Sequence, residues 1–326
     1  MKNICVFDTS IASTNIGDQI IMEAFYNQMS NVLEDAYILK MGTHTPVCHF
    51  YQDFRKNPMV KWMLNCDYKF IGGSNIVLKN MFIPLTQWNI NIFNCKSYKN
   101  SITVGCGLNN NSKRINLYTK LLYKKIFSKE FIHSVRDEET AKVLTSLGYK
   151  ALNTGCPTTW NITKDLCKKI PTKKSNRVIF TLTDYDIDRN YDQKLIDILV
   201  DNYKEVIFFP QGGNDLSYFK TLKNIKNIKI INPNLNSYKG ILKEKNIDYV
   251  GTRLHAGILA INYGIRTIVL IVDNRARDMK KDNNLNSIER KDIDKLEQLI
   301  NCEIITDMNI NERNIKLFKE QFNKCL

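Results

Sequence analysis

The chain has 326 residues, of which 43% are hydrophobic and 10% aromatic, and its formal net charge is +14. This length favours two packed domains, and the hydrophobic content excludes a disordered chain. The positive charge favours anionic partners, such as phosphorylated small molecules or the anionic face of a membrane. Nucleic acid is not an expected partner, because no nucleic-acid-binding motif is present.

The nine cysteines are dispersed without a C-x-x-C pair, and the chain has only four histidines. This pattern predicts no structural zinc site, and we expect no metal elsewhere. The N-terminal apolar run is too short for a signal peptide, and no stretch reaches the roughly 18 apolar residues that span a bilayer. The sequence therefore predicts a cytoplasmic protein.

A strand is predicted at residues 4–8, and a loop of small polar residues follows it. In Asn15-Ile16-Gly17-Asp18, Gly17 allows an unusual turn and Asp18 is predicted to be the N-cap of a helix over residues 18–32. The G-x-G-x-x-G pattern is absent, so a dinucleotide site has no support. A polar loop at this place in an α/β protein is typical of a ligand site; the alternative is a helix cap alone.

Three further strands are predicted at residues 36–40, 68–71 and 101–104. Each ends in glycine and small polar residues, which indicates a parallel sheet whose carboxyl-end loops gather at one edge. A helix is predicted over residues 114–128. Residues 42–55 show no periodicity and are expected to form an irregular loop, in which neither His44 nor His49 is expected to bind metal.

Arg136 follows a predicted strand that ends at Val135 and precedes a helix whose first turn is acidic. An arginine there can bind a carboxylate or a phosphate through two parallel hydrogen bonds. The alternative is an internal ion pair with Asp137 or Glu138.

The second half begins after a basic, turn-prone stretch at residues 164–176, which we interpret as a linker. It contains strands at 178–182, 205–209, 228–231, 248–250 and 267–271, with a helix at 193–200 among them. A last helix, at residues 311–322, is expected to cross back onto the first domain. We therefore predict an α/β fold of two Rossmann-like parallel-sheet domains facing across a cleft, as in GT-B enzymes, with domains at 1–165 and 174–305 and a C-terminal helix within 306–326.

The stretch Gly251-Thr252-Arg253-Leu254-His255 is predicted to be a strand end, a turn and a helix start. Free backbone N–H groups at a helix N-terminus attract anions, and Arg253 and His255 add one fixed and one titratable cation. An anion site is the functional interpretation. The alternative is that Arg253 pairs with a nearby carboxylate and His255 caps the helix.

Four motifs in this order resemble the polysaccharide pyruvyl transferase family: Asn15-x-Gly17-Asp18, Val135-Arg136-Asp137-Glu138, Arg253-Leu254-His255 and Val272-Asp273-x-Arg275. The resemblance implies a GT-B-like fold and transfer of a pyruvyl group from phosphoenolpyruvate to a sugar. The product would be a pyruvate ketal on a cell-surface polysaccharide or its lipid-linked precursor, with release of phosphate. It further implies that Arg136, Arg253 and His255 face the donor.

On this basis we expect His255, Arg253 and Asp18 to be catalytic. The expected substrate-binding residues are Arg136, Arg275, Asn15, Gly17, Asp273 and Leu254. Phosphoenolpyruvate would be a co-substrate, and no cofactor is expected. The first domain would bind the acceptor and the second the donor. A lipid-linked acceptor would place the protein at the inner face of the membrane, to which its basic surface is attracted.

Three positions depart from the family pattern: Arg275 replaces a lysine, Cys156 an aspartate before Pro157, and Gln211 a histidine. Two other functions therefore stay open. One is a GT-B glycosyltransferase with a nucleotide-sugar donor, whose phosphates would use the same arginine and helix termini. The other is a binding or scaffold protein that has lost the donor site.

Overall fold

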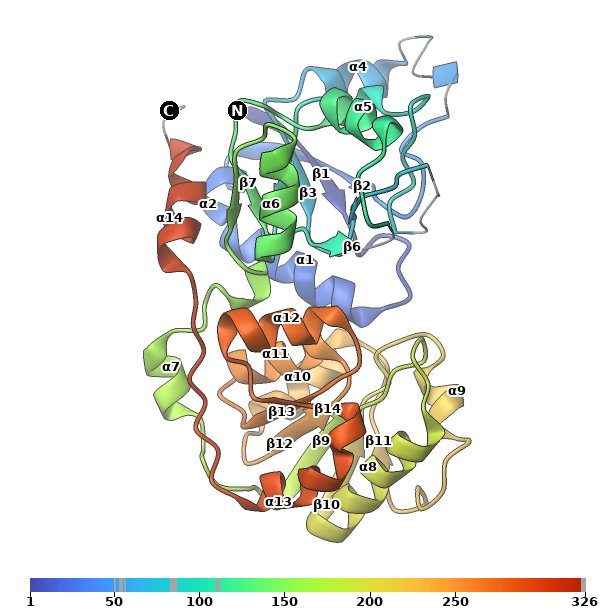
Figure 1. The fold of residues 1–326 in the computed structure, drawn as a ribbon, viewed down its shortest axis with the longest axis vertical. Coiled ribbons are helices and arrows are strands. Elements are labelled where there is room, and N and C mark those ends of the chain that lie inside the picture. Colours follow the sequence, from blue (N-terminus) through green and yellow to red (C-terminus); the bar gives the residue numbers. More distant parts are fainter. Residues whose placement is uncertain (50, 53–54, 56, 83–86, 110–111, 324–326) are drawn as a thin grey trace. The chain divides into compact units, whose positions relative to one another are not determined.

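The computed structural model describes residues 1–49, 51–52, 55, 57–82, 87–109 and 112–323. It divides into two compact units (Figure 1). Unit 1 comprises Met1–Ser13, Ile21–Trp160 and Asn311–Leu326, and unit 2 comprises Thr14–Ile20 and Asn161–Ile310. Parts of the irregular loop predicted at 42–55, and the end of the 306–326 segment, lie outside the described residues.

Unit 1 contains a four-stranded sheet in the order β2-β1-β3-β5, and every neighbouring pair is parallel. Its strands are β1 (Lys2–Asp8), β2 (Ala36–Gly42), β3 (Tyr68–Gly72) and β5 (Ser101–Val104). The parallel pair β7 (His133–Val135) and β8 (Ala151–Asn153) continues beyond β5 through a bridge from Cys106 to Val135. A second small parallel pair joins β4 (Val77–Leu78) to β6 (Leu108–Asn109).

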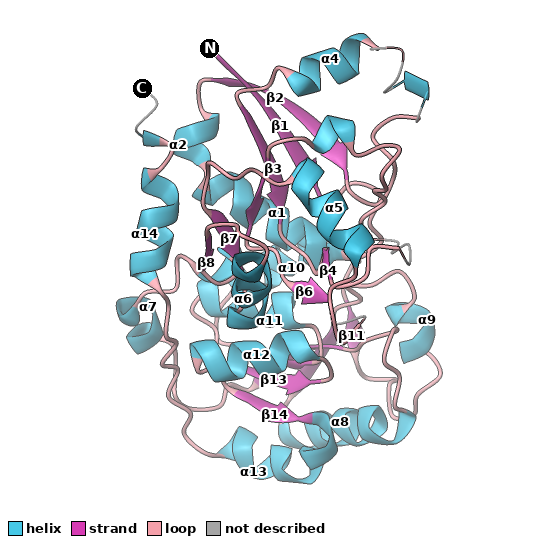
Figure 2. Cartoon of the chain, turned by 45° about the horizontal axis from the view of Figure 1, so that its top comes forward, coloured by secondary structure: helices cyan, strands magenta, loops and turns pink. Residues whose placement is uncertain are grey.

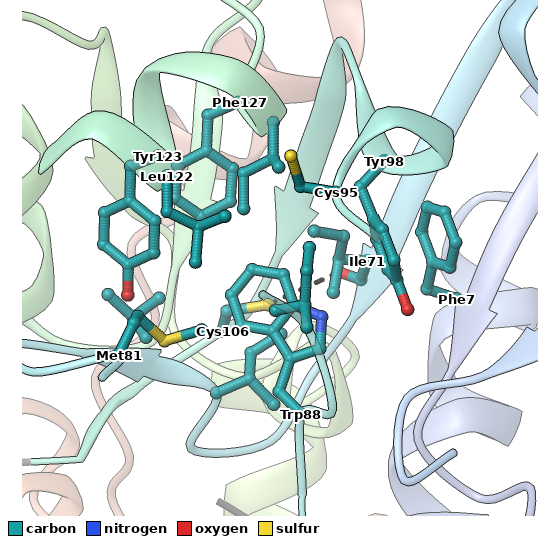
Figure 3. Packing of buried hydrophobic residues seen from close by; sticks show 14 of the residues in the cluster. Phe7, Ile71, Met81, Trp88, Cys95, Tyr98, Cys106, Leu122, Tyr123 and Phe127 are labelled. Carbon is teal, nitrogen blue, oxygen red and sulfur yellow. Dashed lines mark hydrogen bonds between the residues drawn. The ribbon is translucent and has the colours of Figure 1, made fainter. Parts of the chain in front are cut away.

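Successive side chains of β1 point to opposite faces of this sheet, and both faces are covered. Cys5 and Phe7 belong to a core cluster that α4 (Pro58–Leu64), α5 (Leu117–Ile126) and α6 (Glu138–Ser146) cover. Figure 3 shows this cluster, with Leu122 and Tyr123 of α5 close to Trp88. On the opposite face, Phe70 contacts rings of α1 (Ile16–Gln28) and of the C-terminal segment.

The helix predicted over residues 18–32 begins earlier and is divided. It starts at Ile16, where the side-chain Oδ1 of Asn15 accepts a hydrogen bond from the N–H of Gly17 at 3.0 Å. Asp18 therefore lies in the first turn and is not the N-cap. The helix α1 ends at Gln28, and a short α2 (Ser30–Leu33) follows.

Unit 2 contains a six-stranded sheet in the order β11-β10-β9-β12-β13-β14, again with parallel pairs throughout. Its strands are β9 (Arg177–Thr181), β10 (Glu205–Phe208), β11 (Lys229–Ile230), β12 (Asp248–Gly251), β13 (Thr267–Ile271) and β14 (Ser287–Glu289). The chain builds outward from β9 to β11 and then returns to start again at β12. The junction of β9 and β12 is therefore a topological switch point, where open α/β sheets bind ligands.

Helices cover both faces of this sheet (Figure 2). On one face α8 (Arg189–Asn202) packs against α13 (Leu296–Asn301), and α9 (Asp215–Phe219) adds Phe219 to the same core. The other helices are α10 (Leu235–Lys243), α11 (Leu254–Asn262) and α12 (Asn274–Asn283), of which α11 and α12 pack against β13. None of the helices in the described part of the chain is long and apolar enough to cross a membrane.

Part of the predicted linker at 164–176 is helical. The helix α7 (Lys164–Lys169) begins after Thr163, whose side chain accepts a hydrogen bond from the N–H of Leu166. Two lysines in its last turn complement the helix dipole. Some of the basic residues that we interpreted as part of a linker therefore form the last turn of a helix.

The C-terminal helix α14 (Glu312–Glu320) belongs to unit 1. Just beyond it, the ring of Phe322 lies 5.3 to 5.8 Å from the rings of Tyr68, Phe70 and Phe131. The side chain of Gln321 exchanges hydrogen bonds with the backbone N–H and carbonyl of Ile132. The chain end thus completes the core of the unit that contains its beginning.

His133 is buried in β7 as a neutral imidazole. Its Nε2 donates to the carbonyl of Ser128 at 2.8 Å, and its Nδ1 accepts from the N–H of Thr103 at 3.2 Å. Burial lowers the pKa of His133 from 6.5 to about 4. Protonation at Nδ1 would place two N–H groups against each other, so the folded state resists charging of this ring.

We predict that His133 makes the protein less stable as the pH falls from 6.5 to about 4. In that window the unfolded histidine binds a proton that the folded one does not, so the free energy of unfolding decreases with decreasing pH. Urea unfolding across this range should show a shallower slope for His133→Gln than for wild type. The exposed His49→Gln is the control, and an unchanged slope in His133→Gln would contradict the assignment.

Candidate active site

Polar residues gather at the carboxyl-end edge of the sheet in unit 2. The loops that follow β9, β10, β12 and β13 carry Asp184, Gln211, Arg253 and Asp273, respectively. The carboxyl ends of parallel strands meet at one edge of a sheet, so these loops are neighbours. The switch point between β9 and β12 lies directly beneath Arg253.

Arg253 is fixed across the switch point by carboxylates and a carbonyl. Its Nε donates to the Leu182 carbonyl at 3.0 Å and to Asp215 Oδ2 at 3.1 Å. Its Nη2 donates to Asp184 Oδ1 at 2.8 Å and also to Asp215 Oδ1. The alternative interpretation of Arg253, pairing with a nearby carboxylate, is thus what the structure shows. Nη1 makes no hydrogen bond within the part of the chain that the structure describes.

Asp215 organises the loop after β10 around this arginine. Its carboxylate is fully buried and accepts hydrogen bonds from the N–H groups of Gln211, Gly212 and Asp184 at 2.7 to 3.1 Å. Burial raises the pKa of Asp215, and the Arg253 guanidinium opposes that rise. A Cβ at position 212 would collide with Nη2 of Arg253, so only glycine allows the loop to pass so close.

Leu254 and His255 form the first turn of α11, and both side chains are buried. Arg253 occupies the N-cap position, and its side chain makes no capping hydrogen bond. The N-cap residue is therefore Arg253, whereas the alternative interpretation expected His255 to cap the helix. The first turn of α11 carries the positive end of the helix dipole, which attracts anions. Helix α11 thus places His255 in its first turn, at the carboxyl-end edge of the sheet.

Asp273 and Arg275 form a second ion pair at the start of α12, with Tyr185 between the two arginines. Asp273 Oδ1 accepts from the N–H of Arg275 at 2.9 Å as the N-cap, and its Oδ2 accepts from Nε of Arg275 at 2.9 Å. The hydroxyl of Tyr185 donates to Asp273 at 3.0 Å. The ring of Tyr185 lies 5.0 Å from the guanidinium carbon of Arg253 and 5.6 Å from that of Arg275.

The surroundings of Asp273 and Arg275 favour the charged form of both side chains. Burial pushes the pKa of Asp273 upward, but the Arg275 guanidinium and the Tyr185 hydroxyl outweigh it and hold that pKa at about 2. Burial lowers the pKa of Arg275, but Tyr185, Asp273 and Asp18 outweigh it and raise that pKa. Asp273 and Arg275 are therefore both charged at neutral pH, with Asp18 near enough to act on the arginine.

The segment Thr14–Ile20, which was predicted in the N-terminal domain, clusters with unit 2. Nε2 of Gln211 donates to Oδ1 of Asn15 at 2.9 Å, and the N–H of Ile16 donates to the Gln211 carbonyl at 3.0 Å. A Cβ at Gly17 would lie 2.9 Å from Gln211 Nε2, so this approach favours glycine. Gln211 therefore ties the Asn15–Asp18 motif to the same edge.

Two buried polar atoms on these loops make no hydrogen bond to any described residue: Thr183 Oγ1 and Gln211 Oε1. Buried polar atoms are almost always satisfied in folded proteins, so such atoms mark places where a ligand or water binds. Both lie on the loops that follow β9 and β10, on one side of the switch point. This distribution supports a ligand site at the edge that Arg253 and Arg275 occupy.

Arg136 lies in unit 1, at the carboxyl end of β7. Its N–H donates to the Cys106 carbonyl at 3.0 Å, and its Nη2 lies 3.8 Å from Asp137 Oδ2. The predicted internal pair with Asp137 is therefore present, although it is long. Asp137 is also the N-cap of α6, where its side chain accepts from the N–H of Thr140.

Sequence reasoning missed Asp184, Tyr185 and Asp215, which position the two arginines. The sequence did contain a signal for the first two, since Asp184 and Tyr185 lie in the loop that begins after the predicted strand at 178–182, at the end where ligands bind. Asp215 comes after a Gly-Gly pair and looks like an ordinary first-turn helix acid. Only the fold shows that its carboxylate points inward.

The sheet order and the switch point define a two-unit α/β protein, with two paired arginines at the carboxyl ends of the strands of unit 2. A model of the family "Polysaccharide pyruvyl transferase" matches residues 15–274 of the chain. The chain belongs to the polysaccharide pyruvyl transferase family and is a transferase. A search of curated proteins finds no match.

Solved structures show the same fold at low sequence identity. The S. aureus MnaA–UDP structure has a TM-score of 0.57 at 10% identity, covering 100% of this chain and 98% of that chain. UDP-GlcNAc 2-epimerase from Methanocaldococcus jannaschii, solved with UDP-GlcNAc and UDP, has a TM-score of 0.54 at 13% identity and covers 99% of both chains. These are GT-B-type folds, so the predicted α/β class with parallel sheets is confirmed.

We predict that Asp215→Asn destabilises the protein by about 3 kcal/mol, because it leaves the Arg253 guanidinium buried without its main carboxylate. Asp184→Asn is the matched control, since Asp184 accepts a hydrogen bond from the same Nη2 but its side chain is 17% exposed. We expect this variant to lose about 1 kcal/mol or less of unfolding free energy. Urea unfolding measures both. Equal losses in the two variants would contradict the central position given to Asp215.

Proposed function

We propose that the protein transfers a pyruvyl group from phosphoenolpyruvate to two hydroxyls of a sugar, forming a pyruvate ketal and releasing phosphate. One observation carries this proposal. The motifs at Asn15–Asp18, Arg253–His255 and Asp273–Arg275 are far apart in sequence, yet unit 2 gathers them at one sheet edge. These are motifs on which the resemblance to the family depends, and the matched region of 15–274 includes all of their residues except Arg275.

The arginines would bind the donor in fixed directions. Phosphoenolpyruvate carries about three negative charges near neutral pH, and arginine recognises both phosphate and carboxylate. In each of Arg253 and Arg275, Nε and Nη2 are hydrogen-bonded, so the plane of the guanidinium is set before a ligand arrives. The positive end of the α11 dipole complements the same charge. Pre-orientation of this kind favours the charge that develops on the departing phosphate.

The reaction requires two proton transfers. The enol methylene of the donor takes one proton and becomes a methyl group, and two sugar hydroxyls form C–O bonds to the central carbon. The C–O bond to phosphate breaks, and phosphate leaves with the second hydroxyl proton. His255 would supply the proton to the methylene or support the leaving phosphate, and Asp18 would deprotonate a hydroxyl. Gly17, Asn15, Leu254 and Asp273 would shape and orient the substrates, and no cofactor or metal is required by this scheme.

Arg136 belongs to unit 1, which we assign to the acceptor, and it would bind substrate. The acceptor would be a glycan or a lipid-linked saccharide of a cell-surface polysaccharide. A lipid-linked acceptor would keep a cytoplasmic enzyme at the inner face of the membrane, to which a chain with net charge +14 is attracted. A nucleotide sugar is the competing donor, since similar folds have been solved with UDP.

We predict that phosphoenolpyruvate raises the melting temperature of the wild-type protein and that UDP does not. Arg275→Ala should abolish this shift. Arg277→Ala is the matched control, because it lies on the same helix and pairs with Glu289 with half of its side chain exposed; it should keep the shift. A shift with UDP alone would indicate the nucleotide-sugar function, and no shift with either ligand would indicate a protein that has lost its donor site.

We predict that His255→Gln lowers phosphate release from phosphoenolpyruvate, in the presence of acceptor, by about two to four orders of magnitude. The melting shift with phosphoenolpyruvate should persist in this variant, because the arginines that bind the donor are unchanged. Full turnover by His255→Gln would remove the imidazole from the mechanism and leave the donor assignment intact.

A further inference from the structure

One segment of unit 1 carries basic residues without acidic ones. Residues 68–129 contain ten lysines and arginines but no aspartate or glutamate, although acids make up 33 of the 326 residues of the chain. The acids nearest this stretch in sequence are Asp67 and Glu130, which bound it. The excess positive charge of the chain is thus concentrated in part on one segment, which includes α5 and the 3-10 helix η1 (Lys96–Tyr98).

A pocket of about 430 Å³ lies where these two elements meet. Four of its lining residues are exposed lysines, contributed in pairs by η1 with its flank and by the last turn of α5. Its lining comprises Ile92, Phe93, Cys95, Lys96, Lys99, Lys124 and Lys125. The two walls are joined, since η1 packs against α5 and the N–H of Ile92 donates to the hydroxyl of Tyr118 at 3.1 Å. The pocket is therefore lined by both apolar and cationic side chains from two elements that pack together.

Large apolar side chains project from the same surface. The side chains of Phe82, Leu117 and Phe93 are 73%, 71% and 67% exposed, and Leu121 is 47% exposed. The ring of Phe82 lies 5.6 Å from that of Tyr118. Leu117, Leu121 and Lys125 follow each other at intervals of four residues and so share one face of α5. The opposite face buries Leu122 and Tyr123 in the core (Figure 3).

Exposed apolar residues among lysines are costly in water unless a partner covers them. Soluble proteins rarely expose several large apolar side chains together, and such patches mark interaction sites. A nucleic acid would satisfy the lysines but not the aliphatic side chains of Leu117 and Leu121. An anionic bilayer offers phosphates for the lysines and an acyl region for the leucines and phenylalanines.

We propose that this surface docks unit 1 on the anionic face of a lipid bilayer. We name it the α5 surface and define it by Phe82, Phe93, Leu117, Leu121, Lys96, Lys99, Lys124 and Lys125. Lipid phosphates bind between the lysines that line the pocket, and the apolar side chains reach below the headgroups. The inference does not depend on the identity of the donor bound by unit 2, and it would place the unit assigned to the acceptor against the surface that presents lipid-linked saccharides.

The test is co-sedimentation of the full chain with vesicles of phosphatidylcholine alone or mixed with phosphatidylglycerol. The first variant replaces Lys96, Lys99, Lys124 and Lys125 by glutamine. The matched control replaces Lys220, Lys223, Lys226 and Lys229 of unit 2, four exposed lysines on a segment without an exposed aromatic ring. A third variant, Phe93→Ser with Leu121→Ser, keeps the charge and removes apolar area. All these positions are exposed, so thermal melts should match the wild type.

We expect wild type to bind the phosphatidylglycerol vesicles and not the neutral ones. The α5-surface lysine variant should bind about a hundredfold more weakly, while the unit 2 variant binds as wild type does. The Phe93→Ser/Leu121→Ser protein should bind at low salt and lose binding as salt is raised, sooner than wild type. The proposal is overturned if wild type does not bind, if both lysine variants lose binding equally, or if a polynucleotide is bound and the anionic vesicles are not.

Discussion

Asp215 and Arg253 form an ion pair whose two side chains are almost completely removed from water. Burying a guanidinium is costly unless its donors are satisfied, and here Asp215, Asp184 and the Leu182 carbonyl satisfy Nε and Nη2. The same carboxylate accepts backbone hydrogen bonds from the loop after β10. Three carboxyl-end loops of unit 2 therefore depend on one buried carboxylate, and the geometry of the switch point follows from it.

This constraint gives the arginines of the site a particular character. Arg253 and Arg275 are each bound to a carboxylate, and Tyr185 contacts both guanidiniums. Their Nη1 atoms make no hydrogen bond among the described residues. The hydrogen bonds of Nε and Nη2 fix the plane of each guanidinium and therefore the direction of Nη1. The carboxylates reduce the net positive charge of the site, but they also fix the orientation of the guanidinium groups. Fixed cations of this kind favour a ligand whose charge changes position during the reaction. The positive end of the α11 dipole restores part of the attraction for an anion.

Much of the fold follows from the sequence pattern, whereas the pairing of side chains does not. The strands near residues 4, 68, 178, 248 and 267 were predicted within about two residues, because each is a short apolar run that ends in glycine or a small polar residue. Asp18 was misplaced as an N-cap because Asn15, another good capping residue, lies one turn earlier. A helix at Lys164–Lys169 was missed because a short, lysine-rich helix has little apolar periodicity.

The site residues show the same division. Arg253, Asp273 and Arg275 could be chosen because each follows a strand at its ligand-binding end. That Arg253 bonds Asp215, 38 residues earlier, requires knowledge of which loops are neighbours, and the sheet order supplies it. Likewise, the packing of residues 14–20 against Gln211 joins positions 196 residues apart. Local pattern therefore identified the cations, and tertiary structure identified their partners.

Hydrogen–deuterium exchange with phosphoenolpyruvate tests the central claim most directly, because it reports where the ligand acts. If the carboxyl-end edge of unit 2 is the donor site, the ligand should slow exchange together in residues 182–186, 211–215, 252–258 and 272–277. Arg275→Ala should remove that protection. Protection that is confined to other parts of the chain, or no protection at a ligand concentration that shifts the melting temperature, would contradict the assignment of the donor to this edge.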